Sequence, residues 1–163
     1  MLKHIFMAVV IAVFLGSSPV MAAGKCEFYV KASIGVLEFT GTGCMIEGKP
    51  KIEAGKVSGE FTVDLSKLDA GVRTDHMRDK YLEVAKYPKA ALKLDPMPEV
   101  GGAFTGKLTL HGVEKPIAGK ADKTSTCYAF KFDVNSPDFG IAEASYKGIT
   151  IAKTIAVSGT IDN

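Results

Sequence analysis

Residues 57 to 65 read V-S-G-E-F-T-V-D-L, and this short stretch decides how the rest of the chain is interpreted. Apolar residues and one glycine occupy the odd positions, and polar residues occupy the even positions, Ser58, Glu60, Thr62 and Asp64. A period of two places successive side chains on opposite faces, as in a strand with one buried and one solvated face. The stretch therefore predicts a β-strand that covers an apolar core.

The same alternation returns along the chain. It is clearest in residues 103–110, 127–134 and 155–162, and weaker in residues 28–30, 37–39, 90–94, 116–120 and 147–151. Turn-forming residues separate these stretches, for example at 41–43, 47–50, 95–98, 101–102 and 136–138. A meander of about eight short strands either packs as two sheets or closes into a barrel, and closure removes exposed sheet edges. We therefore expect an all-β fold, an antiparallel barrel.

One segment departs from this period. Residues 73–88 read R-T-D-H-M-R-D-K-Y-L-E-V-A-K-Y-P, and Met77, Tyr81 and Val84 recur at helical spacing. Thr74 is a candidate N-cap, and Pro88 follows the end of the pattern. The segment predicts one short helix over about residues 75–86. Its apolar face must be buried, so we expect the helix to lie across one end or side of the barrel.

The first 22 residues differ from the rest in composition. Lys3 and His4 precede an apolar run over residues 5–15, and small residues follow at Ala22 and Ala23. This order is typical of a secretory signal peptide, and the run is shorter than the roughly 20 residues that a transmembrane helix needs. We expect a signal peptide over residues 1–22 and one domain over residues 23–163, which is periplasmic or secreted and has no stable membrane span.

Charge and cysteine content narrow the function further. Without Lys3, 19 of the 20 basic side chains remain against 18 acidic ones, so no basic stripe indicates nucleic-acid binding. The three cysteines, Cys26, Cys44 and Cys127, are an odd number in a compartment that permits disulfides. One bridge and one free thiol is the simplest outcome, and all three pairings are open. A bridge between Cys26 and Cys44 is favoured because both lie in the first hairpin region.

Four stretches, in order, resemble a known family. They are residues 61–71, F-T-V-D-L-S-K-L-D-A-G, the segment 73–88 quoted above, residues 106–117, G-K-L-T-L-H-G-V-E-K-P-I, and residues 135–141, N-S-P-D-F-G-I. They are similar to motifs of the YceI-like polyisoprenoid-binding proteins, which are exported, lipocalin-like barrels. The resemblance implies an antiparallel barrel whose apolar interior takes up a long isoprenoid or similar lipid, with no catalysis and no cofactor.

Alternation and resemblance together suggest which residues would line such an interior. The candidates are Phe39, Phe61, Val63, Met77, Tyr81, Leu92, Leu108, Leu110, Phe130, Phe132, Ile149 and Val157. From alternation alone, the alternative is that these side chains fill a solid core, as they do in many small barrels. A barrel of that kind would be an interaction protein whose loops bind a partner.

The charged residues of segment 73–88 have several interpretations. Arg73, His76 and Arg78 are candidate contacts for the polar head of a lipid, and both arginines could instead bind carboxylates, with Asp64 and Asp138 as candidate partners.

A catalytic alternative is a small hydrolase or isomerase that uses Asp75, His76 and His111 as acid and base groups. No nucleophile motif and no metal-ligand spacing accompanies them, so we predict neither an enzyme nor a metal site. His111 and Gly112 predict a strand end and a tight turn. A homodimer is a further candidate assembly.

Overall fold

The computed structural model describes residues 24–32, 38–142, 145–146 and 149–163. The predicted signal peptide lies outside the described residues. In the described part, ten strands belong to one antiparallel sheet. They are β1 (Gly24–Ala32), β2 (Glu38–Glu47), β3 (Lys51–Glu53), β4 (Lys56–Asp64), β5 (Lys89–Pro98), β6 (Gly101–Leu110), β7 (Val113–Lys123), β8 (Cys127–Asn135), β9 (Ser145–Tyr146) and β10 (Ile149–Asp162).

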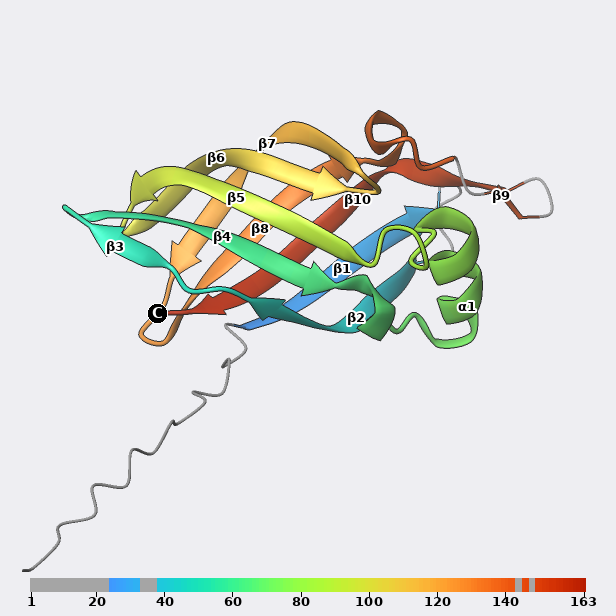
Figure 1. Ribbon diagram of the computed structural model, residues 1–163, viewed down its shortest axis with the longest axis horizontal. Coiled ribbons are helices and arrows are strands. Elements are labelled where there is room, and N and C mark those ends of the chain that lie inside the picture. The colour runs from blue at the N-terminus through green and yellow to red at the C-terminus, as the bar shows by residue number, and fades with distance from the viewer. Residues whose placement is uncertain (1–23, 33–37, 143–144, 147–148) are drawn as a thin grey trace, which may run out of the picture.

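Eight of these strands close into a ring (Figure 1). The order is β1-β2-β4-β5-β6-β7-β8-β10, and β10 also pairs with β1, which completes the closure. The two short strands lie outside the ring, β3 against β4 and β9 against β10. This arrangement confirms the predicted antiparallel barrel of about eight strands.

The alternation that predicted β4 corresponds to its two faces. Val57 and Phe61 are almost fully buried, at 1% and 2% exposure, whereas Glu60 is exposed. Gly59 lies on the inward face between them, and a Cβ atom there would come within 2.9 Å of Phe61 Cζ. The glycine therefore gives the Phe61 ring room to lie over its own strand. The period of two thus reports burial, as expected.

Two seams of the ring have short ladders. Strand β2 pairs with β4 through Ile46 and Glu47, which face Val63 and Thr62. Strand β7 pairs with β8 from Gly119 to Lys123, so its first half has no ladder partner on that side among the described residues. Pro116 lies in this unpaired half, where its missing N–H group costs no ladder hydrogen bond on the open edge. The unpaired parts of both seams lie toward the same end of the barrel as the helical segment.

The helical segment is a series of short turns at one end of the barrel (Figure 1). It contains η1 (Leu65–Lys67), η2 (Gly71–Arg73), α1 (Thr74–His76) and the π-helical turn η3 (Met77–Tyr81). The predicted helix over 75–86 is therefore wrong at its C-terminal end. Glu83 has a left-handed φ of 43°, which breaks the helical path soon after Tyr81.

Thr74 is not the N-cap of the helix, in contrast to the prediction. The hydroxyl of Thr74 accepts a hydrogen bond from the Ala70 amide at 2.8 Å rather than capping the helix that follows it. The carboxylate of Asp69 accepts from the Gly71 amide at 2.8 Å and so organises the turn before the helix. An Asx turn formed by Asp69 and Gly71 has replaced the expected cap. Asp75 does occupy the first helical turn, as predicted.

The helical segment closes the seam between β2 and β4. Asp69 exchanges two backbone hydrogen bonds with Thr42 of β2, at 2.8 and 2.7 Å, and the Leu65 amide donates to the Pro88 carbonyl at 2.8 Å. Leu68, between them, is completely buried. The expectation that this segment lies across one end of the barrel is confirmed. No helix in the described ranges has the length and apolar character of a membrane span.

Candidate functional site

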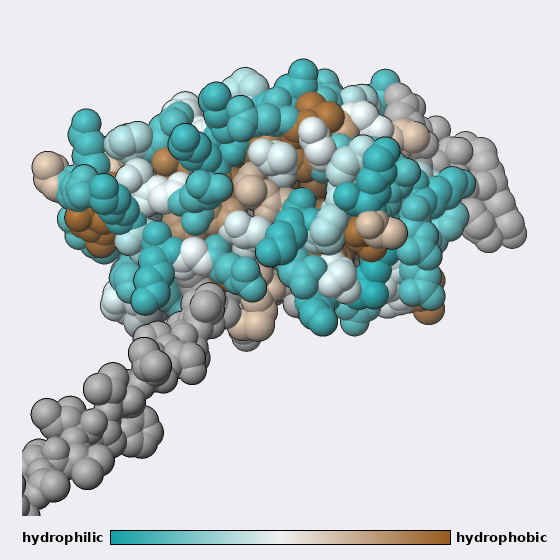
Figure 2. All heavy atoms as spheres, viewed as in Figure 1, coloured by the Kyte–Doolittle hydropathy of each residue, from teal (hydrophilic) through white to brown (hydrophobic). Residues whose placement is uncertain are grey.

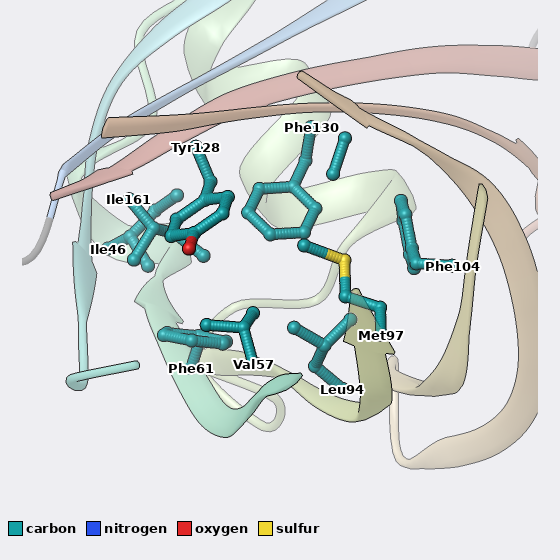
Figure 3. Close-up of a cluster of buried hydrophobic side chains, with 10 residues drawn as sticks. Ile46, Val57, Phe61, Leu94, Met97, Phe104, Tyr128, Phe130 and Ile161 are labelled. Carbon is teal, nitrogen blue, oxygen red and sulfur yellow. The ribbon is translucent and has the colours of Figure 1, made fainter. Parts of the chain in front are cut away.

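The half of the barrel far from the helical segment is filled by its own side chains (Figure 3). Ten buried residues form this group, which we call the distal cluster: Ile46, Val57, Phe61, Leu94, Met97, Phe104, Ala121, Tyr128, Phe130 and Ile161. None is more than 7% exposed. The rings of Phe104 and Phe130 meet edge to face at 5.2 Å, and the Tyr128 hydroxyl donates to the Glu99 carbonyl. This half is a solid core.

The half beside the helical segment is apolar but less completely covered. Its mouth cluster consists of four buried residues, Leu108, Val134, Phe139 and Ile141, and of partly buried residues packed against them, Tyr81, Leu82, Leu110, Val113, Ile117, Phe132, Ile155 and Val157. Ile117 and Phe132 also pack against the distal cluster and so connect the two halves. The mouth cluster offers apolar surface that water still reaches and that an apolar ligand could cover.

The outer surface of the barrel is different in character. Figure 2 shows hydrophilic side chains over most of one face, with hydrophobic atoms visible between them along the middle of that face. Among the described residues, few large apolar side chains are well exposed. They are Met45, Ile52, Val72 and Val100. Val72 lies in the helical segment at the mouth, whereas Ile52 and Val100 belong to hairpins at the distal end.

The predicted lining residues divide between the two halves. Phe61 and Phe130 belong to the distal cluster, and Val63 packs against it. Leu108, Leu110, Tyr81 and Val157 belong to the mouth cluster, and Phe132 contacts both clusters. Met77 and Leu92 are half-buried, and the side chains of Phe39 and Ile149 lie outside the described residues. That these side chains line a lipid stays a prediction.

Several members of the mouth cluster were missed by the sequence analysis. Val134 and Ile155 lie in stretches whose alternation was recognised, so the period could have identified them. Phe139 is the last residue of the turn η4 (Ser136–Phe139) and Ile141 follows this turn, where no strand period exists to indicate burial. Leu82 lies just beyond the helix end and carries no periodic signal either.

Lys115 of strand β7 was also absent from the predicted site residues. Lys115 is directly opposite Leu108 in the β6–β7 ladder and shares the strand face of Val113 and Ile117, yet it is exposed. Side chains two residues apart in a strand lie on one face. A long lysine side chain can lay its methylene groups along apolar surface and keep its charged group in water.

The guanidinium of Arg78 contacts the backbone. Arg78 donates through Nη2 to the carbonyl of Leu68, and its Nε is buried without a hydrogen-bond partner. Asp64, a candidate arginine partner, accepts hydrogen bonds from the hydroxyl and amide of Ser66, at 2.6 and 2.9 Å. These bonds lower the pKa of the Asp64 carboxyl, chiefly the bond from the hydroxyl. Asp138 is exposed in η4.

The two histidines of the barrel domain contact different groups. His76 meets the Tyr81 ring edge to face at 5.4 Å. His111 occupies the predicted β6–β7 turn with a φ of 52°, next to Gly112 at 75°, and its ring contacts Glu83, Tyr87 and Phe139. Within the described ranges no hydrogen bond joins Asp75, His76 and His111 to one another. No group of three or more potential metal ligands gathers in this part of the chain.

Cys26 and Cys44 are direct partners in the β1–β2 ladder. Adjacent antiparallel strands place paired Cα atoms about 4.5 to 5.5 Å apart, within the range that a disulfide spans. Cys127 is a free thiol. The register is therefore compatible with the favoured pairing, which stays a prediction.

A closed antiparallel barrel with a packed distal half, an apolar mouth and a helical segment beside it defines a lipocalin-like protein. The family model of the YceI-like domain matches residues 20–162, and the chain belongs to this family. A relative from Pseudomonas savastanoi pv. phaseolicola, named UPF0312 protein, is 36% identical over 88 residues. The match covers 52% of this chain and 45% of that relative, so the chain spans about half the length of the Pseudomonas relative.

Solved structures share the fold at low sequence identity. The crystal structure of Burkholderia cenocepacia BcnA superposes with a TM-score of 0.67 at 16% identity, over 86% of this chain and 96% of that one. A polyisoprenoid binding domain from Saccharophagus degradans, implicated in plant cell wall breakdown, superposes with a TM-score of 0.62 at 20% identity, over 86% and 93% of the two chains. These similarities identify the fold of the described barrel.

Proposed function

We propose that this protein is an exported, non-catalytic carrier that holds a long apolar lipid of the isoprenoid type against its mouth cluster. The observation that carries the proposal is the contrast between the two halves. The distal half is filled by side chains at most 7% exposed, whereas Leu110, Val157 and their neighbours are only partly buried. A hydrocarbon chain that covers this surface gains roughly 25 cal/mol for each square ångström removed from water.

The comparisons support the ligand class by analogy. The Saccharophagus degradans domain of the same fold is named as polyisoprenoid binding, and this chain belongs to the YceI-like family. Arg73, His76 and Arg78 of the helical segment, together with Lys115, are the proposed contacts for the lipid's polar head. The periplasmic or secreted location in this proposal is supported by the composition of residues 1–22.

The direct test is the content of the purified protein. Organic extraction of freshly prepared protein, followed by mass spectrometry, should recover a long apolar compound at close to one molecule per chain. An extract without such a compound, from protein that also takes up no added isoprenoid, would contradict the proposal.

A pair of variants tests where the lipid lies. Leu110 faces the mouth cluster, whereas its neighbour Thr109 lies on the opposite face of β6. Leu110→Trp fills the mouth and should lower the amount of bound lipid at least tenfold, because the bulky ring occupies the space of the chain. Thr109→Trp adds the same ring outside the barrel and should leave the lipid content within about twofold of the unmodified protein. Equal lipid content in the two variants would place the ligand elsewhere.

A further inference from the structure

His111 contacts hydrogen-bond acceptors on two other segments at once. Its Nε2 lies 2.7 Å from Oε2 of Glu83, and its Nδ1 lies 3.2 Å from the carbonyl oxygen of Phe139. A neutral imidazole carries one N–H group, so it donates to one of these acceptors and turns a lone pair toward the other. An imidazolium carries two N–H groups and donates to both. Both contacts of His111 are therefore hydrogen bonds only when its imidazole carries two protons.

Both members of this pair are at conformationally demanding positions. Glu83 has a φ of 43° and His111 a φ of 52°, values that are unfavourable for a non-glycine residue and persist where surrounding contacts hold them. Glu83 ends the helical segment, and His111 opens the β6–β7 turn. The hydrogen bond from His111 to Glu83 thus ties two strained turns together.

The packing around the pair connects it to the mouth cluster. The Tyr87 ring lies 4.5 Å from the His111 ring, centroid to centroid. It is also so close to Gly112 that a Cβ there would come within 2.6 Å of Tyr87 Cε1. Leu82, immediately before Glu83, belongs to the mouth cluster. Loss of the contact between Glu83 and His111 would therefore release a segment that covers part of this cluster.

Few charged groups compete for the imidazole. On the helical side, Glu83 accepts from it, and the Nζ of Lys86 lies 4.9 Å from the centroid of the Tyr87 ring. On η4, Phe139 supplies a carbonyl, and Asp138 is exposed. On the hairpin of His111 itself, Glu114 is engaged by Lys107 at 3.2 Å. Among the described residues, Glu83 is the carboxylate that forms an ion pair with His111 when the imidazole is charged.

We propose that Glu83 and His111 form a proton-controlled latch at the barrel mouth. The latch is closed when the imidazole carries two protons and is loosened when it carries one, because one of its two hydrogen bonds is then lost. Histidine is the side chain whose unperturbed form changes charge between about pH 5 and 8. The use of the latch, control of lipid exchange at the mouth cluster, rests on the proposed function, whereas the latch itself does not require a ligand.

Hydrogen exchange of the full, ligand-free chain tests the latch without any lipid. The reporter amides are those of Lys86 and Tyr87, which bond to the Glu83 carbonyl at 2.8 and 2.9 Å. After correction for the chemical exchange rate, we expect their protection to be roughly tenfold higher at pH 5.5 than at pH 8, as for a hydrogen bond to a charged group. A peptide from β8 should show no such dependence. Equal protection of the reporter amides at the two pH values would overturn the proposal.

Three variants identify the groups responsible. Glu83→Gln removes the charge and His111→Asn removes the titrating ring, and asparagine tolerates the positive φ of that position. Both variants should lose most of the pH dependence. Glu99→Gln is the matched control, because it neutralises a carboxylate that pairs with Lys123 at 2.7 Å at the distal end. A full pH dependence retained in Glu83→Gln and His111→Asn would contradict the latch.

Release of an apolar fluorescent probe, 1-N-phenylnaphthylamine, separates the latch from the lipid-carrying function. If both hold, the bound probe leaves several-fold faster at pH 8 than at pH 5.5, and Glu83→Gln removes the difference. If the exchange data show the pH effect but neither the probe nor an isoprenoid binds at either pH, the latch is upheld and the proposed function is overturned. If the probe binds and leaves at the same rate at both pH values, lipid carriage is upheld and control by the latch is overturned.

Discussion

The two halves of this barrel are made from the same strands but differ in how completely they are filled. At the distal end, aromatic rings from β6 and β8 pack edge to face. The centroid of the Phe104 ring lies 5.2 Å from that of Phe130 and 6.1 Å from that of Phe132. At the mouth, strands β2 and β4 separate, and the helical segment takes the place of a continuous ladder. One sheet can therefore supply a packed core at one end and an incompletely covered apolar mouth at the other when its seams open there.

Glycines contribute to this difference. Gly119 lies on the inward face of β7, and a Cβ there would come within 2.8 Å of Phe104 Cε1 and of Phe132 Cβ. The bare backbone therefore lets two aromatic rings pack across the barrel at its distal end. Close packing of this kind is sensitive to added or removed volume.

A pair of alanine variants tests which half of the barrel contributes more to the free energy of unfolding. Phe130→Ala, in the distal cluster at 4% exposure, should lower the free energy of unfolding by about 3–5 kcal/mol, since it leaves a cavity. Val157→Ala, in the partly buried mouth cluster, should lower it by about 1 kcal/mol. Urea denaturation of both variants measures the two values. Equal losses would mean that the mouth is as much a structural core as the distal end.

A second test concerns a covalent link in the distal half. Cys26 faces Cys44 on one side and Gly159 on the other, and Gly159 in turn faces Phe130. A disulfide between Cys26 and Cys44 should lower the intact mass by about 2 Da and should stabilise the fold by about 2–4 kcal/mol. Mass spectrometry with and without reductant, combined with thiol labelling, checks the pairing.

The labelling pattern has a defined alternative. Cys127 is a free thiol in the structure and should be the residue that reacts in the oxidised protein. Labelling of Cys26 or Cys44 in oxidised, folded protein would contradict the pairing. Cys127→Ser provides the control, because it should remove all labelling and leave the mass difference unchanged.

The smallest expected effect is a pH dependence at the mouth. The folded-state pKa of Asp64 is below its ordinary value because Ser66 donates to the carboxylate. A lowered folded-state pKa adds stability that is present above the unfolded value and is lost as the pH falls through the folded one. Asp64→Asn should therefore reduce the loss of stability below about pH 4, by less than 1 kcal/mol. Unfolding curves at pH 3 and pH 7 measure the difference.

A matched carboxylate shows whether this effect depends on the hydrogen bonds. Asp138→Asn, at an exposed position of η4, should leave the slope below pH 4 unchanged. An identical change in both variants would mean that net charge, rather than the bonds from Ser66, governs stability in acid.

Several features of the site could be predicted from local sequence, and others could not. Alternation identified the inward positions of β4, β6, β8 and β10, because burial of one strand face requires a period of two. The β6–β7 turn at His111 and Gly112 was also evident, since positive φ values favour glycine in such turns. The end of the helix could not be predicted, because Glu83 adopts its left-handed conformation among contacts with residues from other segments.

The period of the main strands, their inward faces and the family motifs could be read from local sequence, because these depend on residues close together in the chain. The predicted turns at 41–43 and 95–98 were wrong, since these residues lie within β2 and β5. The fold sets which inward residues form the packed distal cluster and which form the mouth cluster. That division depends on how many side chains from different strands converge at each level of the barrel. It also decided that Arg78 binds a backbone carbonyl and that His111 meets Glu83, since both contacts join segments that the sequence keeps apart.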